Sequence, residues 1–178
     1  MADGTPAPVK TWDLLVRASH WTVAGLVLWN LYEDSGGYAH RIVGYGAAAV
    51  VMVRIAWGFV GTAPARFTAW FPTPRKVLAY LSAVKSGHPP RHVSHNPLGG
   101  SMALVLWLLV LALAVTGWMS GLDAFWGDEW LHRLHSYLAN ALLVCAAIHV
   151  LAAIAMSFVH RENLIGAMIT GIKRGEDA

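Results

Sequence analysis

Four stretches of the chain are apolar for long enough to cross a bilayer, and polar connections separate them. A spanning helix needs about 20 mostly apolar residues. The first stretch tolerates Arg17 one turn inside, because a long basic side chain can reach back to the interface. The pattern predicts an all-α integral membrane protein, a four-transmembrane-helix bundle. The predicted spans cover about 13–32, 38–60, 98–119 and 131–159.

The connections fit this arrangement. Residues 33–37 (EDSGG) and 121–129 (GLDAFWGDE) are short polar turns, whereas the loop 61–97 is longer and rich in proline. Within that loop, about 74–86 has apolar and basic positions at helical spacing (PRKVLAYLSAVK). This predicts an amphipathic helix lying on the membrane surface. The whole chain, 1–178, is predicted to form a single membrane domain.

The composition agrees with a membrane protein and narrows the chemistry. Of 178 residues 56% are hydrophobic and only 13% are charged, against about 25% charged in a soluble domain. Cys145 is the single cysteine, which excludes a disulfide framework, an iron–sulfur spacing and a CxxCH motif for covalent haem. The nine histidines therefore become the candidate metal ligands, since imidazole suits iron, copper and zinc.

Basic residues predict the orientation. Eleven of the thirteen lie on the side that holds the N-terminus, the long loop and the C-terminus. Arg41 and Arg133 are the two on the other side. Because Lys and Arg accumulate in cytoplasmic connections, both termini are predicted to be cytoplasmic. The chain is therefore expected to cross the membrane around the cytoplasm several times.

Four histidines fall into two layers when each is placed by depth. The fourth span brings His135 near the outer face and His149 roughly 21 Å deeper, about 40° around the helix from it. His40 begins the second span at the outer edge, and His20 lies in the cytoplasmic half of the first. His132 lies about 100° from the face of His149 and is assigned to the interface. The predicted layers are His40 with His135 outside, and His20 with His149 inside.

Haem is the metal group that suits two imidazoles in each layer. Haem iron needs two axial ligands because the porphyrin supplies the other four, whereas a zinc site gathers four protein ligands. About one helical turn from each ligand stands a small residue, such as Gly44 after His40. Small residues leave space for a flat ring. The sequence therefore predicts two non-covalent haems with His20, His40, His135 and His149 as iron ligands.

Two arginines support an anionic cofactor. Arg54 follows His40 at the spacing that separates His135 from His149, so it is expected inside the bundle at the inner layer. A buried Arg needs an anionic partner, and no acidic residue lies at that depth. Haem propionates would pair with Arg54 and Arg17. The alternative for a single residue such as His40 is a polar interface anchor, and alanine and glycine also occur in spans merely to let backbones approach.

Several motifs resemble one family. SHW in the first span, HRIVGY and VRIAWG in the second, and LHSYLAN and AIHV in the fourth resemble the bacterial cytochrome b561 family, which includes the b-type cytochrome subunits of nickel–iron hydrogenases. HNPLGG and RENLIGAMITG extend the resemblance over about 12–173. It implies a four-helix bundle with two b haems, whose ligands carry over to the four histidines named above. Members pass electrons between a quinone pool and a partner protein, or oxidise superoxide with quinone as acceptor.

The expected function is electron transfer across the membrane between ubiquinone or menaquinone and a redox partner protein. The outer side carries five acidic residues against two basic ones. Such a face suits docking of a basic c-type cytochrome in the periplasm. It would repel superoxide, which is an anion, so superoxide oxidase activity is the alternative function. No catalytic residues are expected, and a quinone-linked oxidoreductase activity stays open.

Other function classes explain less. A metal-ion transporter would combine its histidines with intramembrane Asp or Glu, which the spans lack, and a passive anchor leaves the layered histidines unexplained. Gly117 and Gly121 have the small-xxx-small spacing of helix dimers and leave a homodimer open. Membrane lipid is an expected partner, and nucleic acid is not.

Overall fold

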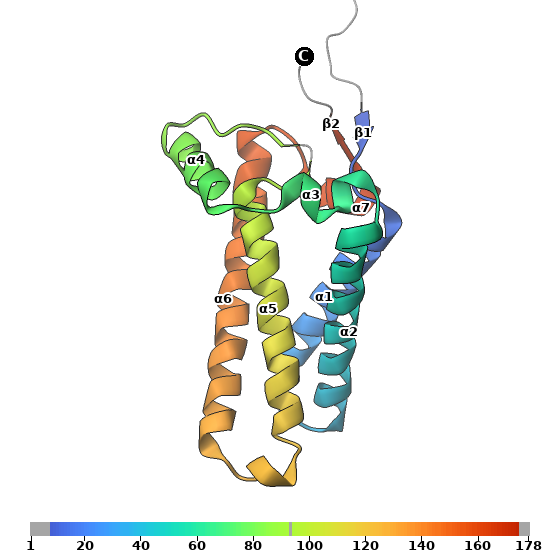
Figure 1. Cartoon of the computed structure of the whole chain (residues 1–178), viewed down its shortest axis with the longest axis vertical. Helices are drawn as coiled ribbons and strands as arrows, with labels where there is room; N and C mark the ends of the chain where they lie inside the picture. Colours follow the sequence, from blue (N-terminus) through green and yellow to red (C-terminus); the bar gives the residue numbers. More distant parts are fainter. Residues whose placement is uncertain (1–7, 93, 175–178) are drawn as a thin grey trace, which may run out of the picture. The chain divides into compact units, whose positions relative to one another are not determined.

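The computed structural model of the chain describes residues 8–92 and 94–174. It contains four long helices (Figure 1), whose apolar sequences favour helix because helices satisfy every backbone polar group within the segment. Three of them, α2, α5 and α6, are long and apolar enough to cross a membrane by length and composition. The long helices are α1 (Leu14–Tyr32), α2 (Tyr38–Val60), α5 (Pro97–Met119) and α6 (Glu129–Val159).

The first helix, α1, differs from the other three. It has 19 residues, enough to span, but it is not among the helices apolar enough by composition. Arg17, His20 and Asn30 lower its mean hydropathy. The structure therefore supports three spans by length and composition, and a fourth crossing by α1 remains a proposal.

Short elements complete the described chain. The amphipathic segment is the helix α4, and Thr73 caps it by accepting a hydrogen bond from the Lys76 backbone N–H. A two-stranded antiparallel pair, β1 with β2, joins the two ends of the described chain; strands this short carry no readable alternation in sequence, so the all-α expectation missed them. The short elements are η1 (Ala63–Ala65), α3 (Phe67–Trp70), α4 (Pro74–Lys85), η2 (Asp123–Phe125), α7 (Leu164–Thr170), β1 (Pro8–Lys10) and β2 (Ile172–Arg174).

The chain divides into two compact units. Unit 2 comprises 18–56 and 103–148, and unit 1 comprises 1–17, 57–102 and 149–178. The core of unit 2 is a buried cluster from α2, α5 and α6: Ala47, Val51, Val110 and Leu142.

Unit 1 is held by a polar and aromatic cluster at the start of α1. Asp13 accepts hydrogen bonds from the Trp57 indole N–H at 2.9 Å and the Thr62 hydroxyl at 2.6 Å. Trp12 is buried beside Ala65, and its backbone N–H donates to the Gly171 carbonyl oxygen at 3.1 Å. Gly171 ends α7 at a φ of 82°, a left-handed conformation that glycine adopts without strain.

The HNPLGG motif has a local role in unit 1. The His95 ring lies between two indoles, 4.7 Å from the ring of Trp12 and 4.9 Å from that of Trp70. Asn96 caps α5 by accepting from the Gly99 backbone N–H at 2.7 Å. A Cβ on Gly100 would come within 3.0 Å of Trp70. The motif therefore joins the start of α5 to the aromatic residues of this unit.

Many large apolar side chains on the long helices are exposed. Leu108 is 68% exposed on α5, and Leu151 and Phe158 are 65% and 79% exposed on α6. Side chains like these are costly in water, and extended apolar surfaces mark contacts with lipid or protein. The exposed faces are those of a membrane protein.

Candidate functional site

A hollow in unit 2 lies between α1, α2, α5 and α6. Its cavity volume is about 80 Å³, and the wider space, which includes open solvent, is about 610 Å³. His40 and His135 line it from α2 and α6, and Gly44 and Gly117 line it from α2 and α5. Most other lining side chains are aliphatic. Two imidazoles thus face one apolar space.

His40 stands in the first turn of α2, held from both sides. Its Nδ1 lies 2.6 Å from the backbone carbonyl oxygen of Glu33. A carbonyl only accepts, so Nδ1 carries the hydrogen and donates it, and the lone pair of the neutral ring is left on Nε2. The side-chain amide of Asn30 on α1 donates to the His40 carbonyl oxygen at 3.0 Å. The first bond orients the ring, and the second holds the backbone of this turn beside α1.

His135 is held by a relay on α5. Its Nδ1 lies 2.8 Å from the hydroxyl oxygen of Thr116. That hydroxyl also lies 2.9 Å from the carbonyl oxygen of Ala112 and 3.1 Å from that of Leu113. We assign the single hydroxyl hydrogen to these carbonyls, which only accept, and with this assignment the His135 Nδ1–H donates to Thr116. His135 therefore also has its lone pair on Nε2.

The spacing of the two rings suits imidazoles that would hold one metal ion between them. Their centroids are 6.2 Å apart, and a metal held between two imidazole nitrogens by bonds of about 2 Å separates the centroids by about 6 Å. A hydrogen bond at the second ring nitrogen is the usual support of a metal-binding histidine. Among the described residues there is no group of three or more His, Cys, Asp or Glu that could hold a metal by themselves. The donor set suits haem, which needs two protein ligands.

The glycines keep the hollow open beside the rings. A Cβ on Gly117 would lie 3.6 Å from Cε1 of His135. On Gly44 it would lie 3.0 Å from the side-chain nitrogen of Asn30. Larger residues would occupy the space that a flat macrocycle needs.

The other predicted residues are distributed over both units. In unit 2, the His20 ring lies 5.1 Å from that of Trp21 in an edge contact. Arg54 is only 5% exposed, and its guanidinium lies 5.3 Å from the ring centroid of Trp107. Unit 1 holds His149, and also Arg17, whose Nη1 donates to the Ile169 carbonyl oxygen at 2.5 Å. The pairing of His20 with His149 stays a prediction.

Sequence reasoning missed three supporting groups: Asn30, the Glu33 carbonyl and Thr116. A signal was available in the two hairpins. In an antiparallel helix pair, residues equally distant from the middle of the connection lie at the same depth. Asn30 lies two residues before the end of α1 and His40 two residues after the start of α2, so this signal is clear for the first hairpin. Thr116 and His135 lie three and six residues from the corresponding ends of α5 and α6, so it is weaker for the second.

Gly117 and Gly121 have roles within unit 2. Gly117 lines the hollow beside His135, and a Cβ on Gly121 would collide with the guanidinium of Arg41. Both small residues are explained by neighbours in the same chain, so their spacing carries no argument for a dimer.

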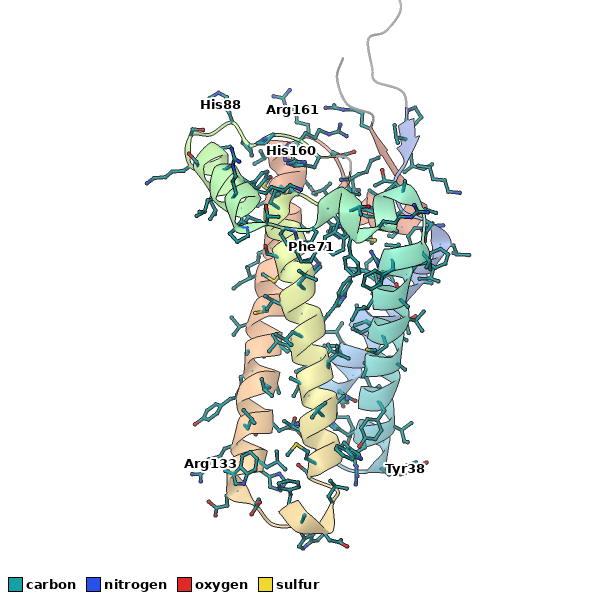
Figure 2. All side chains as sticks on the ribbon, viewed as in Figure 1. Tyr38, Phe71, His88, Arg133, His160 and Arg161 are labelled. Carbon is teal, nitrogen blue, oxygen red and sulfur yellow. The ribbon has the colours of Figure 1, made fainter. Side chains whose placement is uncertain are left out.

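The connections from α1 to α2 and from α5 to α6 keep acidic side chains at the surface. Asp34, Asp123 and Glu129 are exposed. Glu129 pairs with Arg133 at 3.4 Å, an exposed ion pair that contributes little stability. Figure 2 shows Arg133 of α6 and Tyr38 of α2, both in unit 2 and both beside the polar connections.

Comparison with known proteins gives one family and several relatives. The family model for prokaryotic cytochrome b561 matches residues 11–171. A protein of Bradyrhizobium diazoefficiens named "Probable Ni/Fe-hydrogenase B-type cytochrome subunit" is 27% identical over 88% of this chain and 73% of its own. One of the same name from Azotobacter vinelandii is 28% identical over 88% and 75%. The protein named "Cytochrome b562" of Cereibacter sphaeroides is 27% identical over 84% and 89%. No solved structure matches the chain.

Proposed function

The chain belongs to the prokaryotic cytochrome b561 family, and from this premise we propose that it carries electrons across the bacterial cytoplasmic membrane through two non-covalent b haems. The family makes it a membrane b-type cytochrome of electron transport. The proposal adds the number of haems, their ligands and the redox partners.

The observation that carries the proposal is the pair His40 and His135. Both rings have Nε2 as the nitrogen with the lone pair, their centroids are 6.2 Å apart, and they face an apolar hollow. These two residues would hold the outer haem. A b haem bound there supplies a reversible one-electron couple. The chain's own contribution is ligation, a dry environment and the two Nδ1–H hydrogen bonds, which keep the rings oriented and raise their basicity as ligands.

The inner haem is proposed between His20 and His149, with Arg54 and Arg17 as partners of its propionates. Burial of Arg54 supports this, because a buried guanidinium calls for an anion. The proposal includes four spans, with α1 as the first. Both termini then face the cytoplasm by the distribution of basic residues.

A quinone, ubiquinone or menaquinone, is the proposed small redox partner, since a membrane electron carrier must exchange with the diffusible pool. The acidic outer connections support docking of a basic redox protein such as a periplasmic c-type cytochrome. The names of the relatives point to a hydrogenase as another partner. Co-purification from native membranes separates these: we expect a c-type cytochrome to be recovered, and recovery of hydrogenase subunits alone would reject the docking argument.

Superoxide oxidation is the alternative activity, and salt dependence tests it. An acidic face repels an anion, and this repulsion weakens as salt increases. We expect slow superoxide consumption at low salt by the purified protein. Fast turnover that falls as salt rises would favour the superoxide oxidase.

A ligand test addresses the haems directly. The reduced-minus-oxidised spectrum of the purified protein should show b-haem bands, and the pyridine haemochrome should give two haems per chain. His135→Ala should leave one. His132→Ala, one turn earlier on the same helix, is the matched control and should leave two. A preparation without haem, or equal losses in both variants, would reject the proposal.

A further inference from the structure

An open hollow of about 380 Å³ lies in unit 1, directly after the end of α6. The connection from α6, the helix α7 and the strand β2 form its wall. Three of its lining residues are basic, Arg161, Lys173 and Arg174, and one is acidic, Glu162. Because α6 has the length and composition of a membrane span, the hollow lies where a spanning segment ends.

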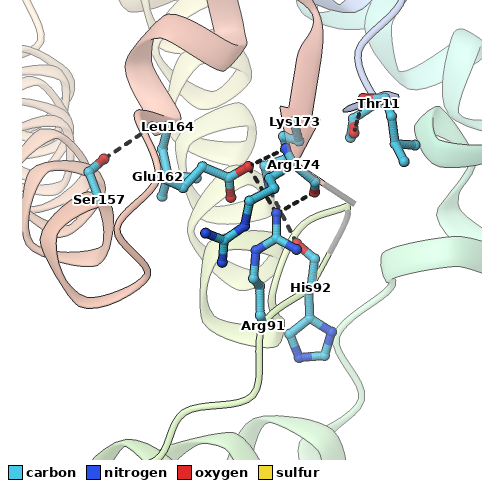
Figure 3. A network of polar contacts seen from close by, with 9 residues as sticks. Thr11, Arg91, His92, Ser157, Glu162, Leu164, Lys173 and Arg174 are labelled. Atoms are coloured by element: carbon cyan, nitrogen blue, oxygen red, sulfur yellow. Dashed lines mark hydrogen bonds and ion pairs between the residues drawn. The ribbon is translucent and has the colours of Figure 1, made fainter. Parts of the chain in front are cut away.

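The carboxylate of Glu162 is occupied by groups of the chain itself (Figure 3). It accepts from the Arg91 guanidinium at 3.0 Å and from the Arg174 backbone N–H at 2.7 Å. Arg91 also donates to the Arg174 carbonyl oxygen. Glu162 therefore neutralises Arg91, which does not line the hollow, and the three basic lining residues leave an excess of positive charge.

The electrostatics of the neighbouring groups agree. Lys173 is 8% exposed, and its ammonium donates to the His92 carbonyl oxygen at 3.2 Å. Burial lowers its pKa; Glu162 opposes this, and Arg91 lowers the pKa further. Burial also lowers the pKa of His160, with Arg91 and Lys173 acting in the same direction and Glu162 against them. Burial disfavours charge of either sign, but the repulsion from Arg91 and Lys173 is between like charges, and a bound anion would offset it.

Exposed apolar side chains lie on the same two elements that wall the hollow, α7 and β2. Ile172 lines the hollow and is 50% exposed. Ile165 and Ile169 on α7 are 41% and 60% exposed, and their spacing places them on one face of the helix. A small soluble anion has no apolar part that would contact these side chains. A molecule with an anionic head and an apolar tail would cover both parts.

We propose that this hollow binds the phosphate headgroup of an anionic phospholipid, with acyl chains against Ile165, Ile169 and Ile172. Basic pockets at the ends of spanning helices bind such headgroups. Arg161 is the residue best placed to change without disturbing the fold, because it is exposed and its side chain extends away from the ribbon (Figure 2). The inference does not depend on the number of haems or their ligands.

The test uses the full chain, purified with its haem and placed in nanodiscs of phosphatidylglycerol and phosphatidylcholine in equal amounts. Native mass spectrometry should show retained phosphatidylglycerol in preference to phosphatidylcholine. Arg161→Gln should weaken this retention by about fivefold, the effect of one basic residue at an anionic membrane surface. Arg75→Gln, an exposed residue of α4 outside the hollow, is the matched control and should leave it unchanged.

Three outcomes would overturn the proposal: equal retention of both lipids, equal losses in the two variants, or displacement of phosphatidylglycerol by inorganic phosphate at equal concentration. The last would indicate a site for a soluble anion. Ile169→Glu is a second variant that adds a negative charge on the exposed face of α7. It should also reduce retention while the haem spectrum, which reports folding, stays that of the parent protein.

Discussion

Removing the hydroxyl of Thr116 should raise the reduction potential of the outer haem. The side chain is 6% exposed, so water cannot replace the acceptor for the His135 Nδ1–H, which lies 2.8 Å from it. This bond makes the ring a more basic ligand and thereby favours the ferric iron. Thr116→Val has nearly the same shape and removes the acceptor.

The magnitude follows from the strength of one buried hydrogen bond. A loss of about 1 kcal/mol of preference for the oxidised state corresponds to roughly 40 mV in a one-electron couple. A redox titration followed by the b-haem absorbance should therefore show one of the two components displaced upward by this amount.

Thr116→Ser retains the hydroxyl and is the matched control, with an expected potential close to that of the parent. A purely structural role for Thr116 would shift both variants alike or lower haem content. No displacement in Thr116→Val, or a downward one, would refute the assignment of the relay. Because the His40 bond goes to a backbone carbonyl, Thr116 is the point at which a side-chain substitution can alter this support.

Three other perturbations test separate parts of the molecule. His149→Ala should reduce the pyridine haemochrome value from two haems to one, and an unchanged value would reject His149 as a ligand. Gly117→Leu should fill the hollow beside His135 and lower occupancy of the outer haem, which full haem content would contradict. In Glu162, burial by itself would raise the pKa, but hydrogen bonds from the Arg174 backbone and the Arg91 side chain prevail and lower it. Since the pKa is lowered in the folded state, the ionised carboxylate stabilises unit 1 fully at pH values above the ordinary pKa of 4.5. This stabilisation is lost as the pH falls through the lowered pKa. Glu162→Gln should therefore lower the free energy of opening of β2 by about 1–3 kcal/mol at pH 7, which hydrogen exchange measures. The difference between variant and parent should vanish in acid, and a difference independent of pH would contradict this role of Glu162.

The long helices could be predicted because their signal is local. An apolar run of the length of α5 or α6 has few alternatives to helix in a membrane, where every backbone polar group needs an internal partner. The amphipathic helix α4 was also readable, since its apolar and basic positions follow the helical period. The crossing by α1 is less well determined, because Arg17, His20 and Asn30 dilute its apolar character.

The positions of His40 and His135 along their helices also come from sequence, because rise and rotation per residue are constant along a helix. Their placement beside one hollow required the packing of unit 2.

Only the tertiary structure decided which ring nitrogens are available. The Nδ1 partners are the Glu33 carbonyl and the Thr116 hydroxyl, which lie on other elements of the fold, and a hydrogen bond depends on position to within a fraction of an ångström. The pairing of β1 with β2 and the bonds from Arg91 and Arg174 to Glu162 likewise join segments far apart in the chain. Sequence determined which residues lie on which helix and how far along it, because these follow from local periodicity. Contacts between distant segments depend on packing, which no local pattern encodes.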